Sequence, residues 1–166
     1  NDFSKFNAEE IAAEAVNEAL SMLRARSVKS GDYAVVIRNS AAADLLEAFT
    51  GIFSAEAVQK NLSLLKGKLN CPIASEKFTL IDDPFMEKGL ASMSFDGEGV
   101  ACKYKKVVDK GVLKTYFHNL KTANKDGVET TGNACKGSYK ASISISPSNF
   151  YVEKGERRFF SGSSWI

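Results

Sequence analysis

Histidine is almost absent from this sequence, since His118 is the only one among 166 residues. A zinc site built on two imidazoles therefore cannot form within the chain. A serine or cysteine nucleophile would likewise have only this one imidazole as its base. Because His118 ends an expected strand, a packed or solvent-edge imidazole is a better interpretation than a catalytic one. We predict no catalytic residue and no metal ligand on this chain.

Cysteine is scarce as well. Cys71, Cys102 and Cys135 lie far apart and form no CxxC pair. An odd count without a pairing pattern favours reduced thiols in a cytosolic protein over a disulfide framework. Cys135 lies in a glycine-containing stretch and is interpreted as a plain loop thiol, because no electropositive partner is evident.

Long apolar runs are also missing. No run approaches the ~20 apolar residues of a membrane span, and the N-terminus lacks the layout of a signal peptide. We therefore expect a cytoplasmic, soluble protein without a membrane partner.

Neither sign of charge dominates the chain. The 22 basic and 20 acidic residues are interspersed and leave a formal net charge of +2. Such a balance does not favour nucleic acid as a direct partner. The densest basic patch consists of lysines of the kind that protect the edge of a hairpin: Lys103, Lys105, Lys106, Lys110 and Lys114.

The sequence does have the length and composition of one globular domain, with 44% hydrophobic and 25% charged residues. Four helical segments are expected, three of them from apolar residues at helical spacing. The first begins after Asn7, an N-cap with Glu10 as its capping-box partner, and ends near Ser27. The others are a helix that Asn39 or Ser40 caps and that runs to Phe53, one through Ala57 to Leu65 that restarts at Ser54, and a short turn from Leu120 to Lys125.

The expected strands centre on a β-hairpin. Val100 to Val108 and Val112 to Phe117 are its arms, and Asp109-Lys110-Gly111 supplies the turn. We interpret residues 129–139 as a surface loop because they are small, polar and glycine-bearing. Further strands are expected at Tyr33–Ile37, Phe78–Ile81, Ser142–Ser146 and Phe150–Val152. The predicted fold class is α+β, with helices packed on a largely antiparallel sheet that holds the central hairpin.

Two groups of carboxylates could face a common cleft: Asp82 with Asp83, and Asp96 with Glu98. Such pairs can act as general acid and base or hold a cation. Aspartate before proline or beside glycine is explained as readily by turn formation, and the residues alone leave both readings open.

Several segments together resemble the carboxy-terminal part of the TldD/PmbA family, the "modulator of DNA gyrase" peptide-maturation proteins. Six of them follow one another in the order and spacing of the family between about residue 9 and residue 156. They are residues 31–37, Asp82-Asp83-Pro84, residues 95–100, residues 109–113, residues 130–134 and residues 149–155.

Within that family the TldD-like branch resembles a zinc metalloprotease, with an HExxxH helix after the strand expected here at Tyr33–Ile37. At that place this chain reads Leu45-Leu46-Glu47-Ala48-Phe49-Thr50-Gly51, without histidine. The resemblance is therefore to the PmbA-like, or TldE-like, branch. It implies a non-catalytic subunit of a cytosolic metallopeptidase complex, with no cofactor on this chain and zinc only on a TldD-like partner.

The resemblance further implies a TldD-like subunit or a second copy of this chain as partner, and an unfolded peptide as substrate. The peptide could pair main chain to main chain with an exposed strand edge. The residues expected near a shared cavity are Asp96, Glu98, Gly99, Thr131, Gly132 and Asn133. Two alternatives remain open, namely a peptidase whose metal site is completed by a partner chain or a missing segment, and an interaction module that modulates DNA gyrase.

The resemblance also bears on domain organisation. Residues 1–156 correspond to the PmbA-like carboxy-terminal domain, and family members are much longer, so the chain is expected to be a fragment. Residues 157–166, RRFFSGSSWI, resemble a later strand segment of the same domain. We expect residues to be missing near Glu156 and Arg157.

Overall fold

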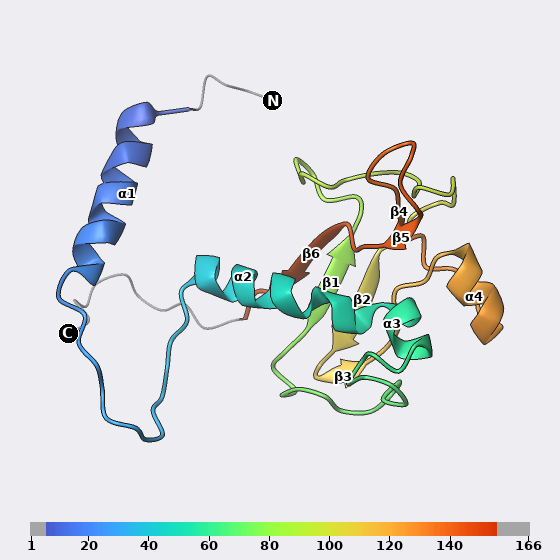
Figure 1. The fold of residues 1–166 in the computed structure, drawn as a ribbon, viewed down its shortest axis with the longest axis horizontal. Coiled ribbons are helices and arrows are strands. Elements are labelled where there is room, and N and C mark those ends of the chain that lie inside the picture. The colour runs from blue at the N-terminus through green and yellow to red at the C-terminus, as the bar shows by residue number, and fades with distance from the viewer. Residues whose placement is uncertain (1–5, 156–166) are drawn as a thin grey trace. The chain divides into compact units, whose positions relative to one another are not determined.

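The computed structural model describes residues 6–155, which fall into two compact units with a division between Val36 and Ile37 (Figure 1). Each unit is described by itself. The expected strand segment at residues 157–166 lies outside the described residues.

The first unit contains one helix, α1 (Ala8–Met22). Asn7 is its N-cap as predicted, and the Asn7 side chain accepts hydrogen bonds from the backbone N–H groups of Glu9 and Glu10 at 3.1 and 3.3 Å. The helix ends at Met22, earlier than the expected end near Ser27.

The prediction of a strand at Tyr33–Ile37 is wrong. These residues have no regular secondary structure, and no strand in residues 6–155 pairs with them. β-Branched residues favour a strand because they pack well on the surface of a sheet. Without a neighbouring strand to pair with, this preference does not produce a strand.

The second unit begins with three short helical segments: α2 (Asn39–Phe49), the 3₁₀ helix η2 (Thr50–Phe53) and α3 (Ala55–Gln59). The N-cap of α2 is Arg38 and not Asn39 or Ser40 as expected. Ser54 is the N-cap of α3 as predicted, but the helix stops far short of Leu65. Asn61 has φ 61°, a left-handed conformation that a continuing α-helix does not allow.

Four antiparallel strands form the main sheet in the order β3-β2-β1-β6. The α+β class and the largely antiparallel sheet are thereby confirmed. The strands are β1 (Leu80–Asp83), β2 (Lys105–Asp109), β3 (Val112–Leu113) and β6 (Asn149–Val152).

The central hairpin is present as β2 and β3, with shorter arms than expected. Asp109 pairs with Val112, so Lys110 and Gly111 form a two-residue loop with φ 47° and 79°. Two positive φ values are the mark of a type I′ turn, whose twist suits a hairpin. A side chain at Gly111 would also have its Cβ 2.3 Å from the carbonyl oxygen of Ala74.

Residues 129–139 are not the simple surface loop that their composition indicates. Gly132, Asn133 and Ala134 are buried, and Ala134–Cys135 forms β4, which pairs with β5 (Ser144–Ile145) in a second small sheet. The strand expected at Ser142–Ser146 is thus reduced to β5.

The core of the second unit lies where η2 and α3 meet the main sheet, and α2 packs on its side. Phe53, Phe117 and Phe150 meet edge to face, with ring centroids 5.4 to 6.4 Å apart. Leu46 of α2 packs against this cluster. Figure 1 shows α2 lying across the sheet on the side of β6.

The expected helical turn after the hairpin is α4 (Leu120–Asp126). Asn119 and Thr122 form its capping box, and Gly127 closes it with φ 67°. None of the helices in residues 6–155 has the length and apolar character needed to cross a membrane.

Candidate functional site

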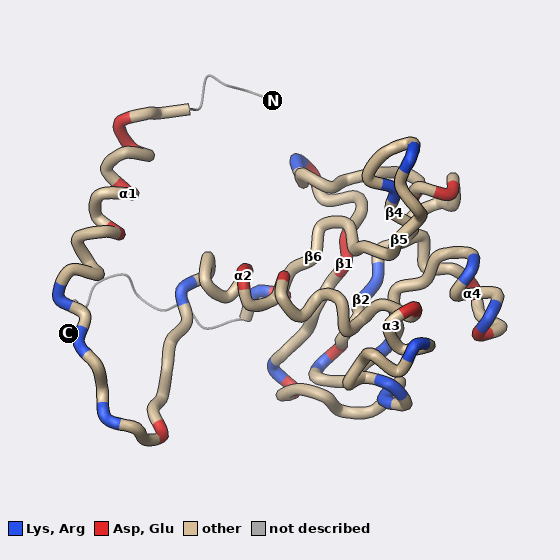
Figure 2. Tube along the Cα trace, viewed as in Figure 1, with Lys and Arg blue, Asp and Glu red and all other residues tan. Residues whose placement is uncertain are grey.

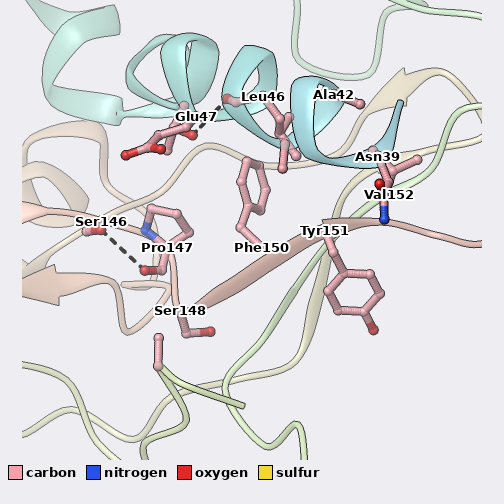
Figure 3. A pocket seen from close by; sticks show the side chains of 13 residues that line it. Asn39, Ala42, Leu46, Glu47, Ser146, Pro147, Ser148, Phe150, Tyr151 and Val152 are labelled. Carbon is pink, nitrogen blue, oxygen red and sulfur yellow. Dashed lines mark hydrogen bonds between the residues drawn. The ribbon is translucent and has the colours of Figure 1, made fainter. Parts of the chain in front are cut away.

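A groove of about 780 Å³ lies between α2 and β6 (Figure 3). Its α2 wall holds Leu46 and Glu47, and its opposite wall is the segment from Ser146 through β6 to Val152. The complete lining is Asn39, Ala42, Ala43, Leu46, Glu47, Thr50, Ala91 and residues 146–148 and 150–152.

The outer edge of β6 is open in the described part of the chain, because β6 ends the order β3-β2-β1-β6. Glu153 donates its backbone N–H to the carbonyl of Thr79 at 2.8 Å, on the β1 side. Alternate residues of a strand direct their backbone groups to the same side, so the N–H groups of Phe150 and Val152 point away from β1. Within residues 6–155 neither of these N–H groups has an acceptor.

A second hollow of about 440 Å³ adjoins the groove. The two cavities share four lining residues: Ala91, Ser146, Pro147 and Ser148. Residues 146–148 therefore form a wall that is common to both cavities. The rest of the second hollow comes from two stretches, residues 93 and 95–97 and residues 132–136.

The common wall is held by Asp82, a fully buried residue of β1. One carboxylate oxygen accepts hydrogen bonds from the N–H and the hydroxyl of Ser148 at 2.7 and 2.6 Å. The other accepts from the ammonium of Lys105 and the amide of Asn133, both at 2.8 Å. Four donors thus satisfy a charge that would otherwise be costly to bury.

Asn133 connects this cluster to the second small sheet. Its side-chain amide also donates to the carbonyl of Ser146 at 3.2 Å, and its backbone carbonyl accepts from the N–H of Ser146 at 3.0 Å. The Asn133 side-chain oxygen is buried and receives no hydrogen bond from the described residues.

Asp96 is a second buried carboxylate, 4% exposed. One of its oxygens accepts from the N–H groups of Glu98 and Val100 at 2.9 and 3.0 Å, and the other from the N–H of Ala134 at 3.0 Å. All three donors are backbone N–H groups, so the Asp96 side chain stabilises the conformation of its loop. For Asp96 these contacts support the interpretation as a turn residue. Asp83 caps a turn in the same way, since it accepts from Phe85 N–H at 2.9 Å.

The six predicted cavity residues do not share one site. Asp96, Gly132 and Asn133 line the second hollow. Thr131 lines a different, shallow hollow, and the Glu98 carboxylate accepts from the N–H of Leu120 at 2.7 Å. Gly99 has φ 79° and lines neither the groove nor the second hollow.

Sequence reasoning missed the groove itself, whose walls are α2 and β6. The available indication was the break at Pro147 between two apolar segments, because proline in a sheet is confined to edges and ends. That α2 would lie beside β6 depends on contacts between residues about 100 positions apart in the sequence, which local patterns do not report.

Asn149, the first residue of β6, fastens the loop of residues 84–95 to the sheet. Its side-chain amide donates to the carbonyl of Asp83 and the hydroxyl of Ser92 at 2.8 and 2.9 Å, and its oxygen accepts from Ala91 N–H at 3.0 Å. Gly89 permits this approach, because a Cβ there would lie 2.6 Å from that oxygen.

His118 is packed inside the second unit and is 6% exposed. Burial lowers the pKa of its imidazole, while Asp126 and a hydrogen bond with the backbone of Thr122 act in the opposite direction. The hydroxyl of Thr131 accepts the backbone N–H of His118 at 2.7 Å. These contacts give His118 a structural environment.

Between residues 6 and 155 no three His, Cys, Asp or Glu side chains gather in a way that could hold a metal ion. Burial raises the pKa of the Cys102 thiol, and nearby Asp96 adds to the effect, so this cysteine is held in its unreactive protonated form.

Figure 2 shows acidic and basic residues interspersed along the trace.

The second unit is a mixed α+β domain whose main sheet has an open strand edge beside a helix. Residues 30–161 match the model of the PmbA/TldA metallopeptidase C-terminal domain. The chain belongs to the PmbA/TldD family.

Relatives of known sequence and structure agree with this assignment. Metalloprotease MJ0996 of Methanocaldococcus jannaschii is 34% identical over 151 residues, which are 90% of this chain and 33% of that protein. A Thermotoga maritima protein of known crystal structure, described as a candidate modulator of a DNA gyrase, shares 46% sequence identity with this chain. The two structures superpose with a TM-score of 0.85 over 94% of this chain and 35% of that chain. TldE from Thermococcus kodakarensis is 32% identical, with a TM-score of 0.61 over 65% of this chain and 24% of that chain. The chain thus spans about a third of the length of such relatives.

Proposed function

We propose that this chain is the TldE-like, non-catalytic part of a cytoplasmic metallopeptidase assembly of the TldD/PmbA type. In this proposal it holds an unfolded peptide in extended form, while a TldD-like partner subunit carries the zinc and performs the cleavage. The family membership supports the general setting, and the groove between α2 and β6 supports the role of this chain.

The observation that carries the proposal is the open edge of β6 inside a groove. Phe150 and Val152 present backbone N–H groups that have no acceptor in the described residues, and an extended peptide could satisfy them as an added strand. Recognition through main-chain hydrogen bonds makes few demands on side chains, which suits a subunit that handles unfolded peptides.

The residues of α2 do not fit the zinc site of the TldD-like branch. That branch carries HExxxH at the place where this chain has Leu45 to Gly51, and imidazole ligands are missing from the whole stretch. Leu46 and Glu47 of α2 and Thr50 of η2 line the groove, where they can contact a peptide without a metal. No step of the proposed role therefore passes through a metal on this chain.

Peptide binding to the purified protein tests the proposal. A fluorescent extended peptide should bind, and the same peptide with alternate backbone amides N-methylated should bind about tenfold more weakly, because it loses the N–H donors that would face β6 and its methyl groups obstruct close pairing with the strand. A matched peptide methylated on the opposite set of amides is the control, since one of the two sets faces the solvent.

Metal analysis tests the division of labour. Zinc should accompany the complex with a TldD-like subunit and be absent from this protein alone. Stoichiometric zinc on the protein alone, or peptide hydrolysis without a partner, would favour instead a peptidase whose site is completed outside the described residues. Equal affinity for both methylated peptides and the unmodified one would refute pairing with β6.

A further inference from the structure

Glu47 is the one Asp, Glu, Lys or Arg side chain among the residues that line the groove. It is exposed, and within residues 6–155 it takes part in no ion pair or hydrogen bond through its side chain. Figure 3 places Glu47 on the α2 wall, at the end of the groove where Ser146 and Pro147 lie.

The neighbours of Glu47 give this end of the groove a mixed character. Leu46, Pro147 and Phe150 supply apolar surface, and Thr50 and Ser146 add hydroxyl groups. The Thr50 hydroxyl is engaged with the carbonyl of Leu46 at 3.0 Å. A carboxylate beside apolar walls suits a long cationic side chain, whose alkyl stem lies on the walls while its charged end remains at the rim.

We propose that the groove selects extended peptides that place a positively charged nitrogen against Glu47. This nitrogen can belong to a lysine or arginine side chain or to the free amino terminus of the peptide, since the recognising chemistry is the same. The inference rests on the proposed function, because it assumes that a peptide lies along β6, and it adds a substrate class.

The expected effect is modest because the ion pair would be partly exposed. Such pairs contribute about 0.2–1 kcal/mol, which corresponds to a preference of up to about fivefold in affinity. Salt should weaken the preference, because counter-ions screen exposed charges. The backbone pairing with β6 should respond far less to salt.

The test compares two peptides that differ only in replacement of one lysine by norleucine, which keeps the alkyl stem and removes the charge. Each peptide is prepared with a free and with an acetylated amino terminus. The wild-type protein should bind the charged forms up to about fivefold more tightly at low salt. Loss of the preference on acetylation identifies the amino terminus, and loss on norleucine substitution identifies the side chain.

Two variants of α2 complete the experiment. Glu47→Gln keeps the shape of the side chain and should abolish the charge preference. Asp44→Asn removes an acid from the same helix that does not line the groove, and it should leave the preference intact. Both residues are exposed, so both variants should fold, and thermal unfolding checks this.

The outcomes separate the two proposals. If the neutral peptide binds along β6 but charge makes no difference, the selection by Glu47 is refuted and the proposed function stands. Equal losses in Glu47→Gln and Asp44→Asn would likewise refute a specific role for Glu47. If no peptide binds at all, both proposals fail.

Discussion

Two regions on either side of Ser148 use their acidic groups in opposite ways. Below the common wall, Asp82 is fully buried and each of its oxygens accepts two hydrogen bonds. In the groove, Glu47 is exposed and has no partner in residues 6–155. In the first region four donors satisfy the carboxylate, and in the second the carboxylate and the outer backbone N–H groups of β6 have no partner among the described residues.

The difference distinguishes a carboxylate that stabilises the fold from one that is available to bind a ligand. The saturated, buried carboxylate of Asp82 fixes the segments around it in one arrangement and has no acceptor capacity left for a ligand. An open strand edge and an unpaired carboxylate have hydrogen-bonding capacity that a ligand can use. Changes to the Asp82 cluster should therefore lower stability, and changes to the groove should lower binding alone.

The largest effect should come from Asp82→Asn. Lys105 would lose the counter-charge beside its 11% exposed side chain, and a donor NH₂ would face other donors. Breaking such a buried pair costs about 3–5 kcal/mol of unfolding free energy, measurable by urea denaturation. Glu129→Gln, which removes the exposed partner of Lys103, is the matched control and should change little. A small loss in Asp82→Asn would show that the cluster does not hold the wall.

Two glycines among the predicted cavity residues should differ in how much stability is lost when each is replaced by alanine, and this effect should be smaller than that of Asp82→Asn. Gly132 and Gly99 both have positive φ, but a Cβ at Gly132 would lie 2.8 Å from the carbonyl oxygen of Ala101, whereas one at Gly99 meets nothing within 4 Å. Gly99→Ala should cost about 1–2 kcal/mol for its left-handed backbone. Gly132→Ala should cost more, because the backbone of Ala101 and Cys102 must also move. Equal melting temperatures for the two variants would contradict this assignment.

The smallest effect should be the pH dependence due to His118. Burial lowers the pKa of this imidazole in the folded state, so the unfolded state binds the proton more readily. Stability should be intact above the unfolded pKa of about 6.5 and should decline as the pH falls from there towards the lower folded pKa. Chemical denaturation of the wild type and His118→Gln at several pH values measures this, and the variant should show a flatter profile below neutrality. A wild type that gains stability on acidification through this window would contradict the burial argument.

Local chemistry predicted several elements well. Asn7 as a helix cap, the Lys110-Gly111 turn and the helix after Asn119 depend on side chains or φ values within a few residues of one another. Such short-range preferences can be read without knowledge of the rest of the fold.

Long-range contacts account for what was missed. Residues 129–139 look like a polar loop, yet Asn133 is buried because Asp82, 51 residues earlier in the chain, accepts its amide. Ser148 is bound to the same carboxylate across 66 residues. The run Tyr33–Ile37 failed for the complementary reason, since its composition favours a strand but no described strand pairs with it.

The six residues expected near a shared cavity are separated in the structure for the same reason. Asp96, Gly132 and Asn133 do line one hollow together, whereas Glu98, Gly99 and Thr131 lie elsewhere. Loop residues adjacent in sequence need not face the same space once buried hydrogen bonds orient the chain.

The side chain of Asn149 joins the edge strand to residues 84–95 through three hydrogen bonds. A displacement of β6 by even a fraction of an ångström would strain those bonds and move the loop with it. Leu90, at the fully exposed tip of that loop, is therefore a natural place for a spectroscopic label that reports whether the neighbouring strand is occupied.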